Sequence, residues 1–144
     1  MNVGQILRGK TKGAASIVET ATVRDAVDEL AQRRIGLLLV TDNDGVFCGV
    51  ISERDVMRAL SEKGGDCLSN RVGDLMTRDV ITCRPAEDSH DALVLMGQNT
   101  IRHLPVVDGG DPDGVISATD ILRSLSETGS AEERAALWTK VAWV

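Results

Sequence analysis

The sequence predicts an α/β fold built from two copies of one βαββα unit. The first observation is an internal repeat, because residues of the first half reappear in the same order in the second. The second is that apolar runs of strand length alternate with segments whose apolar residues recur at helical spacing. The third is that the apolar residues are nearly all aliphatic, with two Trp, one Phe and no Tyr, which suits a core between sheets and helices. The identical aligned pairs include Asp25 with Asp91, Gln32 with Gln98, Val40 with Val106, Asp55 with Asp120 and Arg58 with Arg123.

Each copy is expected to contain the same five elements. A short apolar strand is followed by an amphipathic helix, in which Val23, Val27 and Leu30 share one face in the first copy. Thr22 and Ser89 are expected to be N-caps or first-turn residues of these helices. A buried strand, a turn, a second strand and a closing helix complete the unit. The elements are expected at 15–18, 23–33, 37–41, 46–52 and 53–62, and again at 80–83, 87–98, 103–107, 114–117 and 118–126.

The segments outside the two copies have simpler interpretations. Two matched short helices, 3–7 and 72–76, lead into the copies, and 61–70 with its two glycines is expected to be a linker. Residues 131–144 form a candidate amphipathic helix, expected to pack on the body or on a second subunit. Its apolar residues are Leu137, Trp138, Val141 and Trp143. The predicted divisions are 1–66 for the first unit, 67–128 for the second and 129–144 for the tail.

Composition and charge argue against several classes of partner. The formal net charge of −6 argues against nucleic acid, and Arg8, Lys10 and Lys12 are interpreted as a solvated basic face. An odd number of cysteines, three, without Cys-x-x-Cys spacing indicates reduced thiols and a cytoplasmic location. No apolar run approaches the roughly 20 residues needed to cross a bilayer, so no membrane partner is expected. No spacing of His, Cys or Glu indicates a metal site.

The motif Gly-Val-Ile-Ser-x-x-Asp occurs twice, at 49–55 and 114–120. It predicts a strand that runs directly into a helix, with Ser52 or Ser117 at the N-cap, where free N–H groups and the helix dipole favour an anion. Asp55 and Asp120 lie in the first turn, where a carboxylate can accept two hydrogen bonds from a ribose diol. A structural alternative remains open, because Ser-x-x-Asp also resembles a capping box that stabilises the helix start.

Taken together, these motifs resemble a pair of CBS domains, the arrangement called a Bateman module, of the stand-alone bacterial type. The matching pieces are the two Gly-Val-Ile-Ser-x-x-Asp segments, VGDLMT at 72–77, the 80–82 segment and IRHLPVVD at 101–108. The resemblance implies two βαββα units packed in pseudo-twofold symmetry with two clefts between them. Such modules commonly bind AMP, ADP, ATP, NAD or S-adenosylmethionine as regulatory ligands, and they commonly form homodimers.

The resemblance also assigns roles to individual residues. Asp55 and Asp120 would bind ribose hydroxyls, and the phosphate would face Ser52 with Arg54 and Ser117 with Thr119. The adenine would be flanked by Ile17, Val18, Ile81 and Thr82, and the remaining walls would come from Ile35, Gly36, Leu38, Arg102, His103, Leu104 and Pro105. The copies depart from each other where Leu39 aligns with Pro105 and Arg54 with Thr119, so the two clefts are expected to differ in ligand preference.

The leading functional hypothesis is a ligand-sensing regulatory module that binds an adenosine nucleotide, needs no catalytic cofactor and acts on an unknown regulated protein. An enzyme is disfavoured, because the motifs supply no combination of base, nucleophile and orienting group. A second hypothesis is a non-catalytic assembly protein with vestigial clefts, in which both aspartates are only helix caps. His103 is interpreted as a packed residue, with phosphate contact as the alternative; His90 is expected on an exposed turn, and Cys83 is expected to be a buried small hydrophobe.

Overall fold

The computed structural model describes residues 1–10 and 14–141, with the side chains of 137–141 excepted. The chain divides into two compact units. The continuous unit is Ala14–Val80, and the composite unit combines Met1–Gly13 with Ile81–Val144. The N-terminal helix therefore belongs to the same unit as the second sequence repeat. The predicted division into 1–66, 67–128 and 129–144 follows the sequence repeats and stays a prediction.

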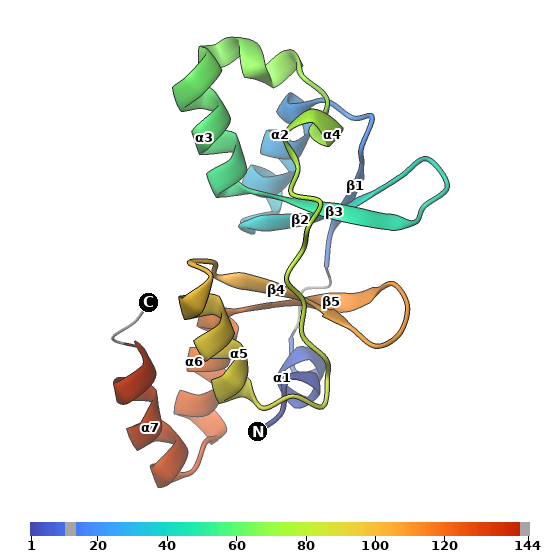
Figure 1. Cartoon of the computed structure of the whole chain (residues 1–144). Coiled ribbons are helices and arrows are strands. Elements are labelled where there is room, and N and C mark those ends of the chain that lie inside the picture. Colours follow the sequence, from blue (N-terminus) through green and yellow to red (C-terminus); the bar gives the residue numbers. More distant parts are fainter. Residues whose placement is uncertain (11–13, 142–144) are drawn as a thin grey trace. The chain divides into compact units, whose positions relative to one another are not determined.

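The continuous unit contains a three-stranded sheet in the order β1-β2-β3 (Figure 1). Strand β1 runs parallel to β2, and β2 pairs with β3 in the antiparallel sense. The helices α2 and α3 pack on each other and on β2 and β3 respectively. The elements are β1 Ser16–Val18, α2 Val23–Arg33, β2 Leu37–Thr41, β3 Phe47–Ser52, α3 Glu53–Lys63, the 3-10 helix η1 Gly64–Ser69 and α4 Val72–Leu75.

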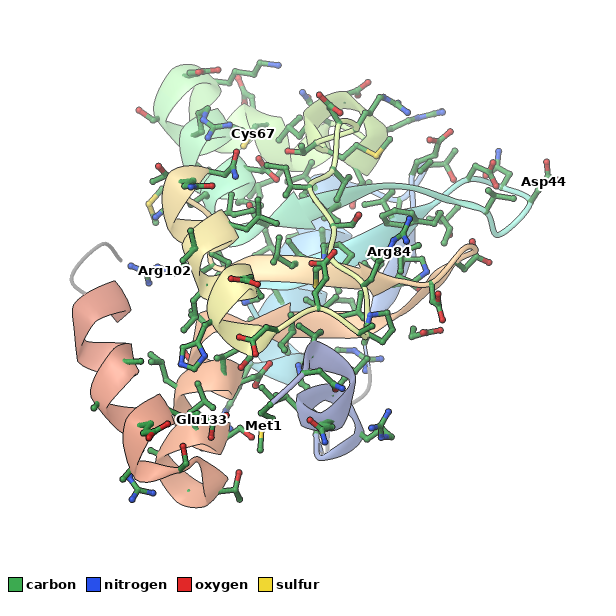
Figure 2. All side chains as sticks on the ribbon, turned by 60° about the horizontal axis from the view of Figure 1, so that its bottom comes forward. Met1, Asp44, Cys67, Arg84, Arg102 and Glu133 are labelled. Carbon is green, nitrogen blue, oxygen red and sulfur yellow. The ribbon has the colours of Figure 1, made fainter. Side chains whose placement is uncertain are left out.

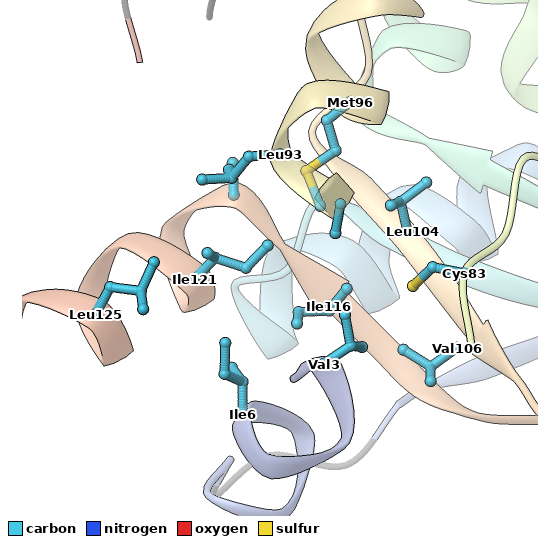
Figure 3. Close-up of a cluster of buried hydrophobic side chains, with 12 residues drawn as sticks. Val3, Ile6, Cys83, Leu93, Met96, Leu104, Val106, Ile116, Ile121 and Leu125 are labelled. Carbon is cyan, nitrogen blue, oxygen red and sulfur yellow. The ribbon is translucent and has the colours of Figure 1, made fainter. Parts of the chain in front are cut away.

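The composite unit has a two-stranded antiparallel sheet, β4-β5, with helices packed on it and on one another. Its core is aliphatic apart from one thiol and one thioether (Figure 3). Its elements are α1 Val3–Arg8, α5 Ser89–Gln98, β4 His103–Val107, β5 Pro112–Ser117, α6 Ala118–Thr128 and α7 Ala131–Val141. Its fully buried side chains include Val3, Met96, Leu104, Val106, Ile116, Ile121 and Leu125.

The mixed α/β class and the order of elements in the first copy are confirmed, and the second copy has the same order apart from its opening strand. The α2 and β2 bounds agree with the predicted ones, and Thr22 caps α2, where its hydroxyl accepts from the N–H of Asp25 at 3.1 Å. In α5 the N-cap is Asp88, and Ser89 is the first helical residue. The segment predicted as the linker, 61–70, has helical structure, because α3 continues to Lys63 and η1 follows it directly.

The opening segments of the two copies differ, and the predicted strand at 80–83 was wrong. In the continuous unit the Leu39 N–H donates to the Ala15 carbonyl at 3.0 Å beside the parallel ladder. Pro105 stands at the position of Leu39 in the second copy and has no N–H to donate. The segment is instead joined to β4 by the isolated bridge between Cys83 and Val106.

The two lead-in helices dock in the same way, each on the sheet-bearing part of the other sequence repeat. The Val3 N–H donates to the Glu87 carbonyl at 2.9 Å, and the Val72 N–H donates to the Ala21 carbonyl at 2.8 Å. Both valines are fully buried. This equivalence explains why the composite unit draws on both ends of the chain.

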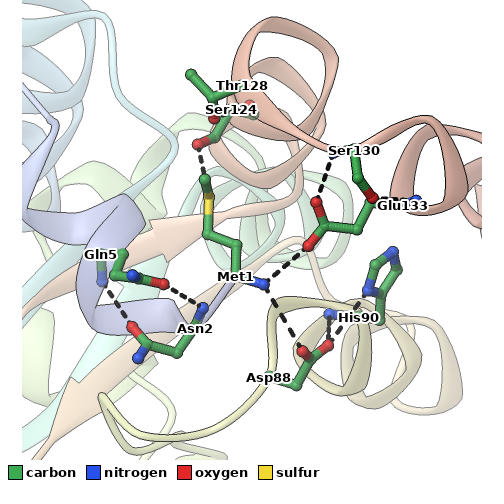
Figure 4. Close-up of polar contacts among 9 residues, drawn as sticks. All are labelled: Met1, Asn2, Gln5, Asp88, His90, Ser124, Thr128, Ser130 and Glu133. Atoms are coloured by element: carbon green, nitrogen blue, oxygen red, sulfur yellow. Dashed lines mark hydrogen bonds and ion pairs between the residues drawn. The ribbon is translucent and has the colours of Figure 1, made fainter.

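Helix α7 packs on α5 and α6 in the composite unit. The Met1 amino group lies 2.9 Å from Glu133 Oε1, and Glu133 also accepts from the Ser130 N–H at the start of α7 (Figure 4). Met1 and Glu133 are neighbours in Figure 2 as well. The predicted tail is thus helical over Ala131–Val141. The side chains of Leu137, Trp138 and Val141, and all of Trp143, lie outside the described residues.

Candidate functional site: two strand-to-helix junctions

The first junction is the segment Ser52–Asp55, where β3 runs into α3. The Ser52 hydroxyl accepts from the Asp55 N–H at 3.2 Å, and Asp55 Oδ2 accepts from the Ser52 N–H at 2.9 Å. This is a complete capping box. The structural alternative raised by the Ser-x-x-Asp spacing is therefore present in the molecule.

The second carboxylate oxygen of Asp55 faces side chains from outside the cap. The Thr77 hydroxyl lies 3.4 Å from Asp55 Oδ1, and the Arg58 guanidinium lies 3.6 Å from the same oxygen. Both distances exceed those of strong charge-assisted bonds, so Oδ1 is held loosely. Thr77, which follows α4, was not predicted to belong to the site.

The second junction is Ser117–Asp120, where β5 runs into α6. The Ser117 hydroxyl accepts from the Asp120 N–H at 3.0 Å, and Asp120 Oδ2 accepts from the Ser117 N–H at 2.9 Å. The local geometry of the first junction is thus reproduced, because the same residues occupy the same positions in both motifs. The Asp120 side chain is 14% exposed, against 7% for Asp55, and so is the more accessible carboxylate.

Lys10 gives the second junction a charge that the first does not share. Its Nζ lies 2.8 Å from Asp120 Oδ2 and donates to the Val115 carbonyl of β5 at 2.7 Å. Its side chain is 24% exposed. The prediction that Lys10 belongs to a solvated basic face was wrong, because the segment after α1 folds back onto β5 and α6. Nothing in the sequence around Lys10 identifies Asp120 as its partner.

The environment of Asp120 changes its acidity. Burial raises the pKa of this carboxyl, but the hydrogen bond and charge of Lys10 and the hydrogen bonds from Ser117 outweigh it. The pKa of Asp120 therefore lies below its ordinary value. The group is a carboxylate at neutral pH, as an acceptor for hydroxyl donors must be.

Protein groups already accept hydrogen bonds from some of the backbone N–H groups in the first turns of α3 and α6. The Glu53 N–H donates to the Gly36 carbonyl at 3.0 Å, and the Ala118 N–H donates to the Arg102 carbonyl at 2.9 Å. With Asp55 N–H and Asp120 N–H held by the serine hydroxyls, two amides of each first turn are used. An incoming anion therefore depends on nearby cations more than on the helix amides alone.

The glycine that opens each motif is in close contact with another segment. A Cβ on Gly49 would lie 2.6 Å from the Thr77 carbonyl, whose residue exchanges two backbone hydrogen bonds with Val50. A Cβ on Gly114 would lie 2.8 Å from a methyl group of Leu7. The space that the missing Cβ leaves at each glycine is therefore filled by protein, by backbone in the first copy and by a side chain in the second.

The other predicted site residues fall into three environments. Ile17 and Val18 lie on β1, and Ile81 and Thr82 lie in the irregular segment before Cys83. Leu38 and Leu104 are fully buried in the cores of their units. Their roles in a ligand site stay predictions. The remaining residues flank the strands and helix starts: Ile35 and Gly36 before β2, Arg102 before β4, His103 and Pro105 on β4, and the exposed Arg54 and Thr119 on α3 and α6.

The remaining reactive side chains have structural surroundings. Burial, with the charge of Glu87, raises the pKa of the Cys83 thiol to about 12, in agreement with a buried small hydrophobe. His90 was predicted on an exposed turn, but its side chain is only 13% exposed, with Nδ1 3.2 Å from Asp88 Oδ1. Within residues 1–10 and 14–141 no group of three or more His, Cys, Asp or Glu could hold a metal ion. The helices of that same part of the chain include none with the length and apolarity to cross a membrane.

Comparisons with known proteins agree with this architecture. The mitochondrial CBS domain-containing protein CBSX3 of Arabidopsis thaliana is 35% identical over 108 residues, which cover 72% of this chain and 52% of that protein. The chain spans about half or less of the length of the curated relatives it matches. The crystal structure of the CBS-domain containing protein ATU1752 from Agrobacterium tumefaciens is 30% identical with a TM-score of 0.80, covering 85% of this chain and 92% of that one.

A third similar protein was solved with a ligand. It is a CBS domain protein from Pyrobaculum aerophilum complexed with AMP, 28% identical with a TM-score of 0.76, and the similarity covers 99% of both chains. The family model of the CBS domain matches residues 3–62 and again 72–127, which together span most of the sequence. This chain therefore belongs to the CBS domain family and carries two copies of the domain.

Proposed function

We propose that this chain is a ligand-sensing regulatory module that binds an adenosine nucleotide through its two strand-to-helix junctions. The observation that carries the proposal is the duplicated placement of an aspartate carboxylate in the first turn of a helix, behind a serine N-cap. A CBS relative of the same length is complexed with AMP, which supports an adenosine compound as the ligand. AMP, ADP, ATP and NAD all present the adenine and ribose that such a site would recognise.

The chemistry of the junction suits a ribose diol. An ionised carboxylate only accepts hydrogen bonds, and each of its oxygens offers two lone pairs. In Asp55 the cap occupies Oδ2, whereas Oδ1 has only the long contacts to Thr77 and Arg58. In Asp120 Lys10 and Ser117 share Oδ2. In both cases Oδ1 is the oxygen that a sugar hydroxyl would approach.

The proposed module is not an enzyme and acts by changing its packing. Ligand binding would have to favour one arrangement of the protein, and a homodimer or a regulated partner would then read that arrangement. In this proposal the bound nucleotide is retained rather than converted.

A second candidate function is an assembly protein in which both aspartates are only caps. One observation favours it, because each capping box is complete without any ligand. The same geometry occurs at Thr22–Asp25, where no ligand is expected. In that case partner binding would be unchanged when both junction aspartates are replaced.

A thermal-shift screen separates these functions. Nucleotide-free protein is heated with AMP, ADP, ATP, NAD, NADH and S-adenosylmethionine, alongside Asp55→Ala, Asp120→Ala and the double variant. A ligand at 100 times its dissociation constant adds about 2.7 kcal/mol, which is a shift of several degrees. Asp25→Ala is the matched control, since it removes the same type of capping box outside the junctions.

We expect one adenosine compound to stabilise the wild type and Asp25→Ala alike, with a smaller shift in each single variant and none in the double variant. A shift that survives in the double variant, or no shift with any compound, would contradict the proposal and favour the assembly protein.

A further inference from the structure

The ammonium of Lys10 has a position at the second junction that a helix cap does not require. The Ser117–Asp120 capping box is complete without it, as its counterpart at Ser52–Asp55 shows. Lys10 nevertheless bridges Asp120 Oδ2 and the Val115 carbonyl, at 2.8 and 2.7 Å, from a segment distant in sequence. An ammonium has three N–H donors, and these two contacts leave one.

The repeat itself shows what Lys10 replaces. At the residue before the aspartate, the first junction has Arg54 and the second has Thr119, so the sequence motif alone gives the second junction no cation. A phosphate near the start of α6 would meet the negative charge of Asp120. The partly exposed Lys10 ammonium beside Asp120 offsets that charge.

We propose that Lys10 is a specificity-determining residue of the second junction, where it offsets the charge of Asp120 and donates its third N–H to the phosphate of the bound nucleotide. This inference rests on the proposed function. It predicts that the second junction distinguishes phosphorylated from neutral adenosine compounds by means of a residue outside the repeated motif. The ribose contact remains with Asp120, so the neutral nucleoside depends little on Lys10.

The test measures AMP and adenosine separately at the second junction. An Asp55→Ala background removes the first junction, and Lys10→Met and Lys10→Arg are added to it. Lys63→Met is the control for a lost positive charge, because Lys63 lies exposed in the last turn of α3. Dissociation constants come from NMR titrations, which register weak binding as well as tight binding.

Lys10→Met is expected to weaken AMP binding about 10- to 100-fold, the loss typical of one hydrogen bond to a charged group, and to change adenosine binding less than about threefold. Lys10→Arg and Lys63→Met should both keep the preference for AMP. Equal losses for AMP and adenosine would make Lys10 a structural residue and overturn the inference, and tighter binding of both would make it a competitor of the ligand. If the Asp55→Ala protein itself bound neither compound, the proposed function of the second junction would fail as well.

Discussion

At the first junction Asp55 lies near the Thr77 hydroxyl and Arg58, whereas at the second Asp120 forms a close ion pair with Lys10. The two caps themselves match, because the motif residues that form them are the same. Arg58 lies on α3 itself and recurs as Arg123 in the second copy, whereas Thr77 and Lys10 come from the segments after α4 and α1, which are distant in sequence from the motifs they reach. The repeated motif therefore sets the position of each carboxylate, and the segment after α1 adds a positive charge at the second junction only.

The sheets behind the junctions differ in the same manner. The first has a parallel third strand, and the second has one isolated bridge in its place. Two prolines contribute to this difference, since each removes a backbone donor. Pro105 stands at the position of Leu39, whose N–H donates to the Ala15 carbonyl. Pro85 stands at the position of Glu19, whose N–H donates to the Thr41 carbonyl at 2.8 Å.

The largest expected effect comes from placing proline in the continuous unit. Leu39→Pro removes the N–H that donates to Ala15 and the burial of the leucine side chain, and should lower the free energy of unfolding by about 3 kcal/mol or more. The reverse change, Pro105→Leu, should cost less than half as much, because the second copy already lacks this bond. Urea denaturation followed by circular dichroism measures both. Equal costs would show that the strand difference has another cause.

The next largest loss of stability is expected at the two motif glycines, Gly49 and Gly114. Gly49→Ala would drive a Cβ against the Thr77 backbone and should cost about 2–3 kcal/mol, whereas Gly114→Ala meets the movable end of Leu7 and should cost about 1 kcal/mol. The same denaturation experiment gives both values. A larger loss for Gly114→Ala would contradict the contacts assigned to these glycines.

A smaller effect depends on pH. Lys10→Met should destabilise the protein by about 1–2 kcal/mol at neutral pH through loss of the Asp120 ion pair. The pKa of Asp120 is lowered in the folded protein because Lys10 and Ser117 outweigh burial, so its contribution is present above the ordinary value of 3.8 and is lost as pH falls through the folded value.

The difference in melting temperature between wild type and Lys10→Met, measured from pH 7 down to pH 3, should therefore be largest near neutral pH and narrow below pH 3.8. A difference that stays constant over this range would mean that Lys10 contributes packing and not charge.

The smallest effect is expected at Thr77. Its hydroxyl lies 3.4 Å from Asp55 Oδ1, which is long for an O–H···O bond, so Thr77→Val should change the free energy of unfolding by less than about 0.5 kcal/mol. A loss above 1 kcal/mol in chemical denaturation would show that the two carboxylates are held with similar strength after all.

The sequence was sufficient for features that depend on neighbouring residues. The caps at Thr22, Ser52 and Ser117 follow from short spacings, and the β2 and β4 bounds follow from apolar runs between turn residues. Ser89 shows the precision of such arguments, because Asp88 is the stronger acceptor one residue earlier and takes the cap.

Features that depend on contacts between distant segments could not be predicted. The sequence around Lys10 gives no indication that its ammonium contacts Asp120. The packing of α1 on β5 is a tertiary contact that local sequence does not determine. The missing strand at 80–83 was predictable in principle. The sequence shows that Pro105 replaces Leu39. The loss of its N–H affects strand pairing only where a neighbouring parallel strand would accept that hydrogen bond, and the sequence does not show which strands are neighbours.

Calorimetric titration of AMP is the most direct test of whether two unequal junctions bind an adenosine nucleotide. Nucleotide-free wild type, Asp55→Ala, Asp120→Ala, the double variant and the capping control Asp25→Ala are compared. We expect AMP binding in wild type and Asp25→Ala, one remaining site in each single variant with different affinities, and no binding in the double variant. AMP binding of unchanged affinity in the double variant, or none in the wild type, would contradict it.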